Sequence, residues 1–329
     1  MLGVFLLAAA AGPQVAELKT FKNWIVGCDN GLLCQASAMM PEADTGITVT
    51  VRRGPEGSAA PQVWLRSLDN DPVDVSADGK PLGIHLAKNA DDAFVVAPAD
   101  AMRLLDTLRS AKQVEAIGKD GKSVGGILVD GASAALLYMD DQQHRLGTKG
   151  ALVRRGDKPN SAVPPPPPLP VAYTVPGSSK PPLKLSPAFV AKVRKDNDCA
   201  DETDPNLVDQ NRLDATHTFA MITLICQSGA YNYISENYVI RDGGGSPQRA
   251  KFEDMGAKDE NDLSYNLNWD PKTRRLQSGM KGRGIGDCGG RQEYVWDGSM
   301  FRIVKLEEMD DCRGVIDFIT TWRARVVER

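Results

Sequence analysis

The chain has 329 residues, of which 39 are Lys or Arg and 43 are Asp or Glu, so its formal net charge is −4. Hydrophobic residues make up 42% and charged residues 25% of the chain, as in ordinary globular proteins. This length suits two domains with separate cores, and the lack of a basic excess argues against a nucleic-acid-binding protein.

The N-terminal residues 1–16 are predicted to be a signal peptide. Residues 1–12 form an apolar run that is too short to span a membrane and fits the hydrophobic region of an export signal. No Lys or Arg precedes the run, so a buried first strand or helix is the alternative. No second apolar stretch is long enough for a membrane span. We therefore expect a periplasmic or secreted protein.

A proline-rich segment divides the rest of the chain. Of the 21 prolines, 11 lie between Pro159 and Pro187, and those from Pro164 to Pro168 are consecutive. Such a run favours polyproline II and acts as a semi-rigid spacer, with a docking site for a proline-reading domain as the alternative. We predict domains at residues 17–155 and 186–329, held apart by a linker at 156–185.

The first domain is predicted to be α+β, with antiparallel strands and two helices. Apolar residues that alternate with polar ones predict strands, and Asp120-Gly121 predicts a hairpin turn. Gly147 is expected to cap the second helix. The predicted strands are 47–53, 62–68, 93–97, 113–118 and 123–129, and the predicted helices are 98–109 and 132–145.

The second domain is predicted to be an antiparallel β-meander after one short helix. Ser186 and Pro187 suit the N-cap and the first position of that helix. Two later hairpins each place a Trp-Asp pair at the turn. The predicted helix is 186–195, and the predicted strands are 217–226, 231–241, 263–269, 274–276, 292–296, 300–304 and 321–327.

Six cysteines behind an export signal predict three disulfides. Several pairings are possible, but a rigid spacer disfavours a bond between the domains. The pairs that we favour are Cys28–Cys34, Cys199–Cys226 and Cys288–Cys312. The last pair flanks the final hairpin and would clamp its open end.

No metal or cofactor site is predicted. Cys-x-x-Cys spacing is absent and the three histidines lie far apart in the sequence, which argues against structural zinc. The acidic segment 196–204 lacks the Gly and Glu of an EF-hand loop, so we expect a solvated loop, with a calcium site as the alternative. Residues 284–289 fit Gly-x-Gly-x-x-Gly, but they contain Cys288 and precede a predicted strand rather than a helix.

No catalytic residue is predicted either. Ser278 and Lys281 match the Ser-x-x-Lys of penicillin-recognising enzymes, but the partner motifs of that family are missing. A cell-wall or glycan hydrolase would need converging groups, and the nearest candidates are Asp287, Glu293 and Ser278. Their spacing indicates no convergence.

Basic residues are concentrated in one stretch of the second domain. On adjacent hairpin strands they would form a cationic patch that suits an anionic envelope component, such as a lipid phosphate or an acidic glycan. A solvated face or a charged edge strand is the alternative. The residues are Lys272, Arg274, Arg275, Lys281, Arg283 and Arg291.

Several motifs resemble a bacterial exported family known as domain of unknown function 1176. They are Lys281–Gly289, Tyr294–Phe301, Cys312–Gly314 and Trp322–Ala324, together with Cys226 and Gly229–Asn232.

The first domain is similar to invasion-associated locus B proteins in Phe21, Trp24, Cys28 and Cys34, and in the segment from Val129 to Ala135. The resemblance implies a periplasmic or envelope-associated protein and carries over no catalytic residue. We therefore expect a non-enzymatic envelope protein that binds a partner or an anionic component. A hydrolase and an inhibitor of a host or competitor enzyme are the alternatives.

Overall fold

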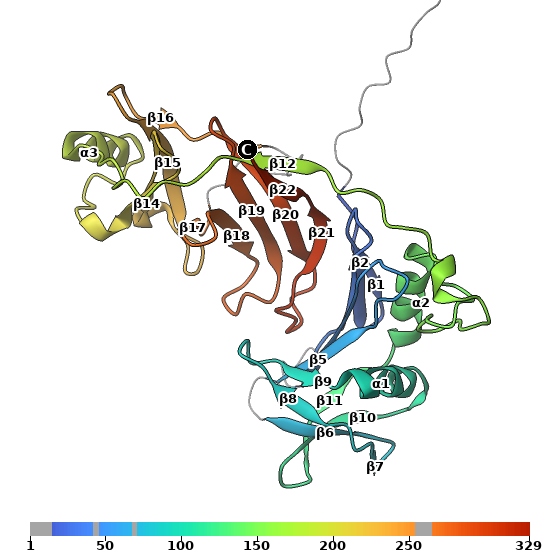
Figure 1. Ribbon diagram of the computed structural model, residues 1–329. Helices are drawn as coiled ribbons and strands as arrows, with labels where there is room; N and C mark the ends of the chain where they lie inside the picture. The colour runs from blue at the N-terminus through green and yellow to red at the C-terminus, as the bar shows by residue number, and fades with distance from the viewer. Residues whose placement is uncertain (1–14, 42–45, 68–70, 254–264) are drawn as a thin grey trace, which may run out of the picture.

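The computed structural model describes residues 15–41, 46–67, 71–253 and 265–329 (Figure 1). These residues form several antiparallel sheets and three α-helices, so the chain is mostly β. Nearly all of the predicted leader lies outside the described residues.

The first half of the chain, residues 17–155, builds two sheets and two helices. The seven-stranded sheet has the spatial order β1 (Lys19–Phe21), β2 (Trp24–Cys28), β3 (Cys34–Ala38), β4 (Ile47–Arg53), β5 (Gln62–Ser67), β9 (Phe94–Val96) and β8 (Leu86–Lys88). The four-stranded sheet has the order β11 (Ser123–Ile127), β10 (Val114–Gly118), β6 (Pro72–Ala77) and β7 (Lys80–Pro81). The helices are α1 (Pro98–Ser110) and α2 (Ala132–Gln142).

Strand β4 explains how the seven-stranded sheet has two buried faces. Ile47, Val49 and Val51 point into the apolar core that α1 and α2 also line. Thr48 and Thr50 alternate with them and are also buried, and the Thr50 hydroxyl lies 3.0 Å from that of Ser37. The second face therefore carries polar groups that need partners beyond the sheet.

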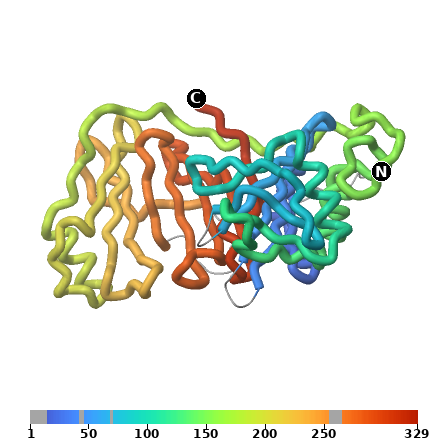
Figure 2. The backbone as a smooth tube through the Cα atoms, turned by 90° about the horizontal axis from the view of Figure 1, so that it is seen from below, coloured from blue at the N-terminus to red at the C-terminus, as the bar shows by residue number. Residues whose placement is uncertain are grey.

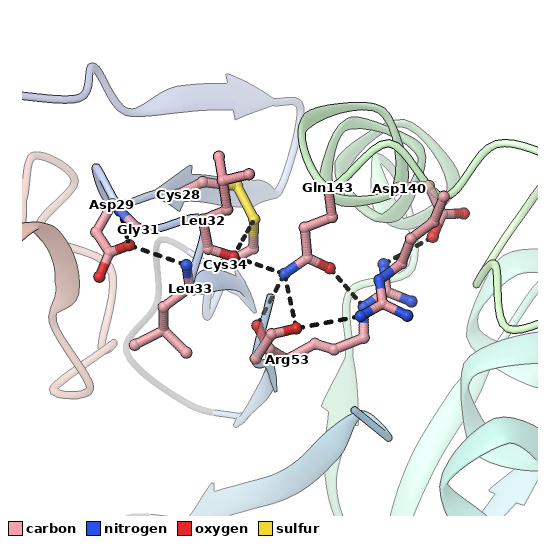
Figure 3. The surroundings of a disulfide bond; sticks show 11 residues. Cys28, Asp29, Gly31, Leu32, Leu33, Cys34, Arg53, Asp140 and Gln143 are labelled. Atoms are coloured by element: carbon pink, nitrogen blue, oxygen red, sulfur yellow. Dashed lines mark hydrogen bonds and ion pairs between the residues drawn. A yellow bond between two sulfur atoms is a disulfide. The ribbon is translucent and has the colours of Figure 1, made fainter. Parts of the chain in front are cut away.

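The turn between β2 and β3 is tied to the end of α2 (Figure 3). Gln143, the C-cap residue of α2, donates to the carbonyl oxygens of Leu32 (2.8 Å) and Arg53 (2.9 Å). Arg53 in turn donates to Asp140 at 2.8 Å, and both of these side chains are fully buried. The predicted end of this helix was wrong: α2 stops at Gln142, because His144 adopts a positive φ, and Gly147 lies beyond the helix in a separate turn.

The second half, residues 186–329, builds two further sheets after α3 (Pro187–Asp196), whose N-cap Ser186 accepts a hydrogen bond from Phe189 N as predicted. One sheet has the order β13 (Val208–Arg212), β14 (His217–Leu224), β15 (Ile234–Arg241) and β16 (Gln248–Arg249). The other has the order β17 (Asn268–Asp270), β18 (Arg275–Lys281), β19 (Gly289–Trp296), β20 (Phe301–Met309) and β21 (Ile319–Arg323).

An aromatic core joins these two sheets. Phe219 of β14, Tyr294 and Trp296 of β19, and Phe301 of β20 are all nearly or fully buried there. The Phe219 and Phe301 rings meet edge to face, with centroids 4.8 Å apart. These aromatic side chains therefore form the core of the second half.

The last predicted strand and the predicted spacer both differ from expectation. Residues 321–327 do not form one strand: the chain passes from β21 to β22 (Arg325–Glu328), which pairs in parallel with β12 (Val171–Thr174). Strand β12 lies inside the segment 156–185 that was predicted to be a linker. Figure 2 shows this segment in green along the outside of the molecule, crossing from the first half to the second.

The two halves contact each other directly. The second face of the seven-stranded sheet packs against the end of the chain, where Ile25 and Met39 are buried with Val315, Phe318 and Ile319. The expectation that a stiff spacer holds the halves apart is therefore wrong. The predicted domain limits themselves stay a prediction.

Polar contacts reinforce this interface. Asp317 accepts hydrogen bonds from Trp64 Nε1 at 2.7 Å and from two nitrogens of Arg66 at 2.8 Å each. Asp29, in the turn of Figure 3, forms an ion pair with Arg323 of β21. Polar groups on the second sheet face thus find their partners in the other half of the chain.

The three disulfides join the pairs that the sequence favoured, and no cysteine is free among the described residues. Cys28–Cys34 closes the turn between β2 and β3, where the two residues are register partners. Cys288 immediately precedes β19 and Cys312 follows β20, so their bond clamps the open end of that hairpin as predicted.

Candidate anion-binding groove

A polar groove of about 350 Å³ crosses the face of the five-stranded sheet that points away from the aromatic core. Strand alternation places Gln277, Gly279 and Lys281 of β18 on this face, opposite Glu293 and Arg291 of β19. Their neighbours along the strands point to the other face. The groove is therefore a consequence of the two-residue period of paired strands.

Glycine keeps the floor of the groove open beside Arg291. Gly279 pairs with Arg291, and a Cβ at Gly279 would lie 3.2 Å from the Gly290 carbonyl oxygen and 3.4 Å from Arg291 Cγ. A larger residue there would displace the arginine side chain.

Two asparagines from outside the strand hold Lys281 in position. The Lys281 N–H donates to Asn232 Oδ1, and Asn232 Nδ2 donates to the Lys281 carbonyl oxygen, both at 2.9 Å. Asn266 Nδ2 donates to Asn232 Oδ1 at 2.8 Å and to the Gly279 carbonyl oxygen at 2.7 Å. The backbone of β18 is thus fixed where its last side chain reaches the groove.

Arg291 is oriented by an aromatic ring. Its guanidinium carbon lies 3.9 Å from the centroid of Phe318, close enough for a cation–π interaction. Phe318 is itself almost fully buried at the interface between the halves. Within the described part of the chain, no carboxylate lies within 4.0 Å of the Arg291 guanidinium or of Lys281 Nζ.

The other predicted cations are neutralised or lie elsewhere. Arg275 forms an ion pair with Glu293 at 3.3 Å at one end of the groove, and burial lowers the pKa of Arg275 while Glu293 opposes that shift. Arg274 donates to the Val175 carbonyl oxygen and forms an ion pair with Glu328. Lys272 is exposed in the turn before β18.

Arg283 also has a structural partner. Its guanidinium binds Asp287, whose side chain is fully buried and also accepts a hydrogen bond from Gly314 N at 2.6 Å. Burial alone would raise the pKa of Asp287, but these two partners lower it. Of the six predicted cations, the structure brings Lys281 and Arg291 to the groove without an acidic partner among the described residues.

Sequence reasoning missed several residues of this site, including the amides Asn266, Asn268 and Gln277. Lys305 and Glu307 of β20 line the groove and form an ion pair at 2.7 Å. Their alternation with the inward-facing Leu306 was a signal that a strand-period reading would have found. Asn232 and Phe318 belong to other segments of the chain, and no local pattern points to their role.

The candidate hydrolytic groups are engaged in structural contacts. Ser278 and Glu293 both line the groove, but Ser278 is 3% exposed and donates its hydroxyl to the Tyr265 carbonyl oxygen, and Glu293 is paired with Arg275. Asp287 does not line the groove and is buried beneath its loop, where Arg283 binds it.

The acidic segment 196–204 uses its carboxylates locally. Glu202 Oε1 accepts a hydrogen bond from Cys226 N at 2.6 Å, and Asp204 accepts one from Asn206 N. Within the described residues, ligand atoms of Cys199, Glu202 and Cys226 lie within 4.8 Å of one another, but both sulfur atoms are bonded in the disulfide. A disulfide sulfur is not the thiolate that binds metals.

None of the helices in the described segments is long and apolar enough to span a membrane.

Comparison with known proteins gives a relative of similar length. No solved structure matches the chain. It is 27% identical to the uncharacterized protein YpfG of Escherichia coli (strain K12) over 344 aligned positions, which cover 93% of each protein.

The model of a protein family of unknown function, DUF1176, matches residues 18–325, and so runs through both halves and the proline-rich segment. The similarity of the first half to invasion-associated locus B proteins stays a prediction. The chain belongs to the DUF1176 family.

Proposed function

We propose that the protein is a non-enzymatic binding module of the cell envelope, exported to the periplasm, which binds an anionic envelope component in the groove over β17 to β20. The three disulfides and the lack of a membrane-spanning helix among the described residues are consistent with export. The observation that carries the binding proposal is the pair Lys281 and Arg291, held by neighbouring residues but lacking an acidic partner.

The physical argument is electrostatic. A protein with a net charge of −4 repels anions over most of its surface, so an anion is attracted only where cations are locally in excess. Arg291 is stacked on Phe318, so its guanidinium needs little reordering when a ligand binds, and the backbone that carries Lys281 is fixed by Asn232.

Retention on a cation exchanger at low ionic strength tests this proposal. We expect the double variant Lys281→Ala/Arg291→Ala to elute at a clearly lower salt concentration than the wild type. With two cations fewer in the groove, less screening by salt is enough to release the protein from the resin. Lys119→Ala/Lys272→Ala removes the same charge from exposed positions and is expected to elute like the wild type. Equal shifts for both variants would show that net charge alone decides retention, and would contradict the proposal.

Crosslinking in intact cells would then identify the ligand. A photoreactive residue at Gln277, which is exposed in the groove, is expected to capture a component that the same residue at Lys272 does not. Identical products from both positions would count against a specific site.

The two alternatives from the sequence have weaker support. A hydrolase would need a nucleophile and a base that are available to substrate, whereas Ser278, Asp287 and Glu293 are engaged in structural hydrogen bonds and ion pairs. An enzyme inhibitor would depend on the loop 282–288, where the Ile285 side chain is 59% exposed. Neither alternative explains why Lys281 and Arg291 are held side by side without an acidic partner.

A further inference from the structure

The residues that line the groove also indicate the chemical class of its ligand. We infer that its ligand is an acidic glycan, in which a single carboxylate binds Lys281 and Arg291 while sugar hydroxyls bind the amides of Asn268 and Gln277. This inference rests on the proposed function and names the chemical class of the ligand.

Arg291 presents its guanidinium in a fixed orientation. Stacking on Phe318 fixes the plane of the guanidinium and leaves its N–H donors free, since none of them bonds to another described residue. A planar fork of donors matches the two oxygens of a carboxylate. Lys281 supplies a second positive charge on the same sheet face.

The groove contains carboxylates as well as cations. Three cations (Lys281, Arg291 and Lys305) and two carboxylates (Glu293 and Glu307) line the groove. Lys305 pairs with Glu307 and Arg275 pairs with Glu293, which leaves Lys281 and Arg291 to bind the ligand. The two glutamates repel a phosphate dianion more strongly than a carboxylate, so their presence in the groove favours a carboxylate.

Two side-chain amides extend the groove beyond its charged residues. Asn268 and Gln277 are register partners on β17 and β18, both are exposed, and neither side chain bonds to another described residue. Free amides donate and accept together, as sugar hydroxyls do. An extended peptide is disfavoured, because β18 and β19 already pair on both edges and offer no free backbone for strand addition.

Three forms of one disaccharide test the inference. NMR titration would compare cellobiose, cellobiouronic acid with its single carboxylate, and cellobiose 6-phosphate. We expect the carboxylate form to bind at least about tenfold more tightly than cellobiose, the worth of one charge-assisted bidentate contact. The phosphate form should bind more weakly than the carboxylate form. The variant Glu307→Gln removes one repelling carboxylate and should therefore reduce the difference in affinity between the two forms.

Variants separate the two parts of the ligand. Arg291→Lys keeps the charge but removes the fork, and should weaken binding of the carboxylate form several-fold. The double variant Asn268→Ala/Gln277→Ala should lower the affinity for cellobiose and for cellobiouronic acid by the same factor, because both sugars carry the hydroxyls that these amides would bind.

The outcomes distinguish this inference from the proposed function. Tighter binding of the phosphate form, lost in Lys281→Ala/Arg291→Ala, would overturn the glycan carboxylate and leave the anion site intact. No binding of the carboxylate form, with the cation-exchange difference still present, would overturn the inference in the same way. If the carboxylate form does not bind and the cation-exchange difference is also absent, both the inference and the proposed function are overturned.

Discussion

At the scale of single residues, Asp214 joins the two sheets of the second half. It lies in the turn between β13 and β14, where its carboxylate accepts hydrogen bonds from Thr216 N and from Trp296 Nε1, both at 2.7 Å. Burial alone would raise the pKa of Asp214, but these bonds and those from His217 outweigh it and lower the pKa to about 2. The charged form is therefore the one that holds the sheets together.

We predict that Asp214→Asn destabilises the protein by roughly 2 kcal/mol at neutral pH, because an unfolded aspartate has a pKa near 4. A folded pKa below the unfolded one means that this stability is present above about pH 4, and is lost as the pH falls from about 4 to about 2. Urea unfolding at a series of pH values would measure this loss as a change in the free energy of unfolding. The exposed Asp201→Asn should keep the wild-type profile. Parallel profiles of Asp214→Asn and the wild type would show that the argument is wrong.

At the scale of elements, the hairpin β19–β20 links the groove to a disulfide. Cys288 immediately precedes β19, and Gly286 in the same loop lies against Lys281, with a Cβ position 3.7 Å from Lys281 Cδ. Beyond Cys312 the chain leads through Gly314 to Phe318, which supports Arg291. The Cys288–Cys312 bond thus restrains both segments that position the groove cations.

This arrangement predicts that two disulfides of similar stabilising effect differ in their effect on binding. Cys288–Cys312 and Cys199–Cys226 close loops with sequence separations of 24 and 27, and each should stabilise by roughly 3.5 kcal/mol on the chain-entropy argument. Replacing either pair by alanine should lower the urea midpoint to a similar degree. Only loss of Cys288–Cys312 should lower the salt concentration at which the folded protein leaves the cation exchanger. An equal loss of retention in both variants would contradict the link.

At the scale of the whole molecule, the two halves act as one unit through buried polar and apolar contacts. Besides the apolar cluster around Ile25, Arg313 donates to the Met40 carbonyl oxygen at 3.0 Å and to Asn23 Oδ1 at 2.9 Å. Asn30 exchanges two hydrogen bonds with the backbone of Arg323, and so covers part of the edge of β21.

We therefore predict that cutting the proline run does not separate the halves. A protease site in place of Pro164–Pro168 should give two fragments that co-elute in gel filtration. Adding Asp317→Ala, which leaves the Arg66 guanidinium without its bidentate partner at a cost of about 2 kcal/mol, should promote separation. Fragments that separate with Asp317 in place would mean that the interface is too weak to hold them.

Local sequence patterns were sufficient for much of the fold. The period of β4, the Ser186 cap of α3 and the turn of the β19–β20 hairpin depend on neighbours in the sequence, and all three occur as predicted. The favoured disulfide pairing is confirmed, but its argument depended on a spacer that holds the halves apart, whereas the structure shows them in contact. The cluster of basic residues was also visible, but its division into paired and unpaired cations was not.

Tertiary structure decided what no local pattern records. Asp317 meets Arg66 across the interface and Asn232 reaches Lys281 from the segment before β15, so both contacts join segments far apart in the sequence. The sequence by itself therefore determined elements such as β4, the Ser186 cap and the β19–β20 turn, since these reflect short-range sterics and hydrogen bonding. Only packing decided which charges are cancelled and which remain for a ligand, because an ion pair depends on distance in space.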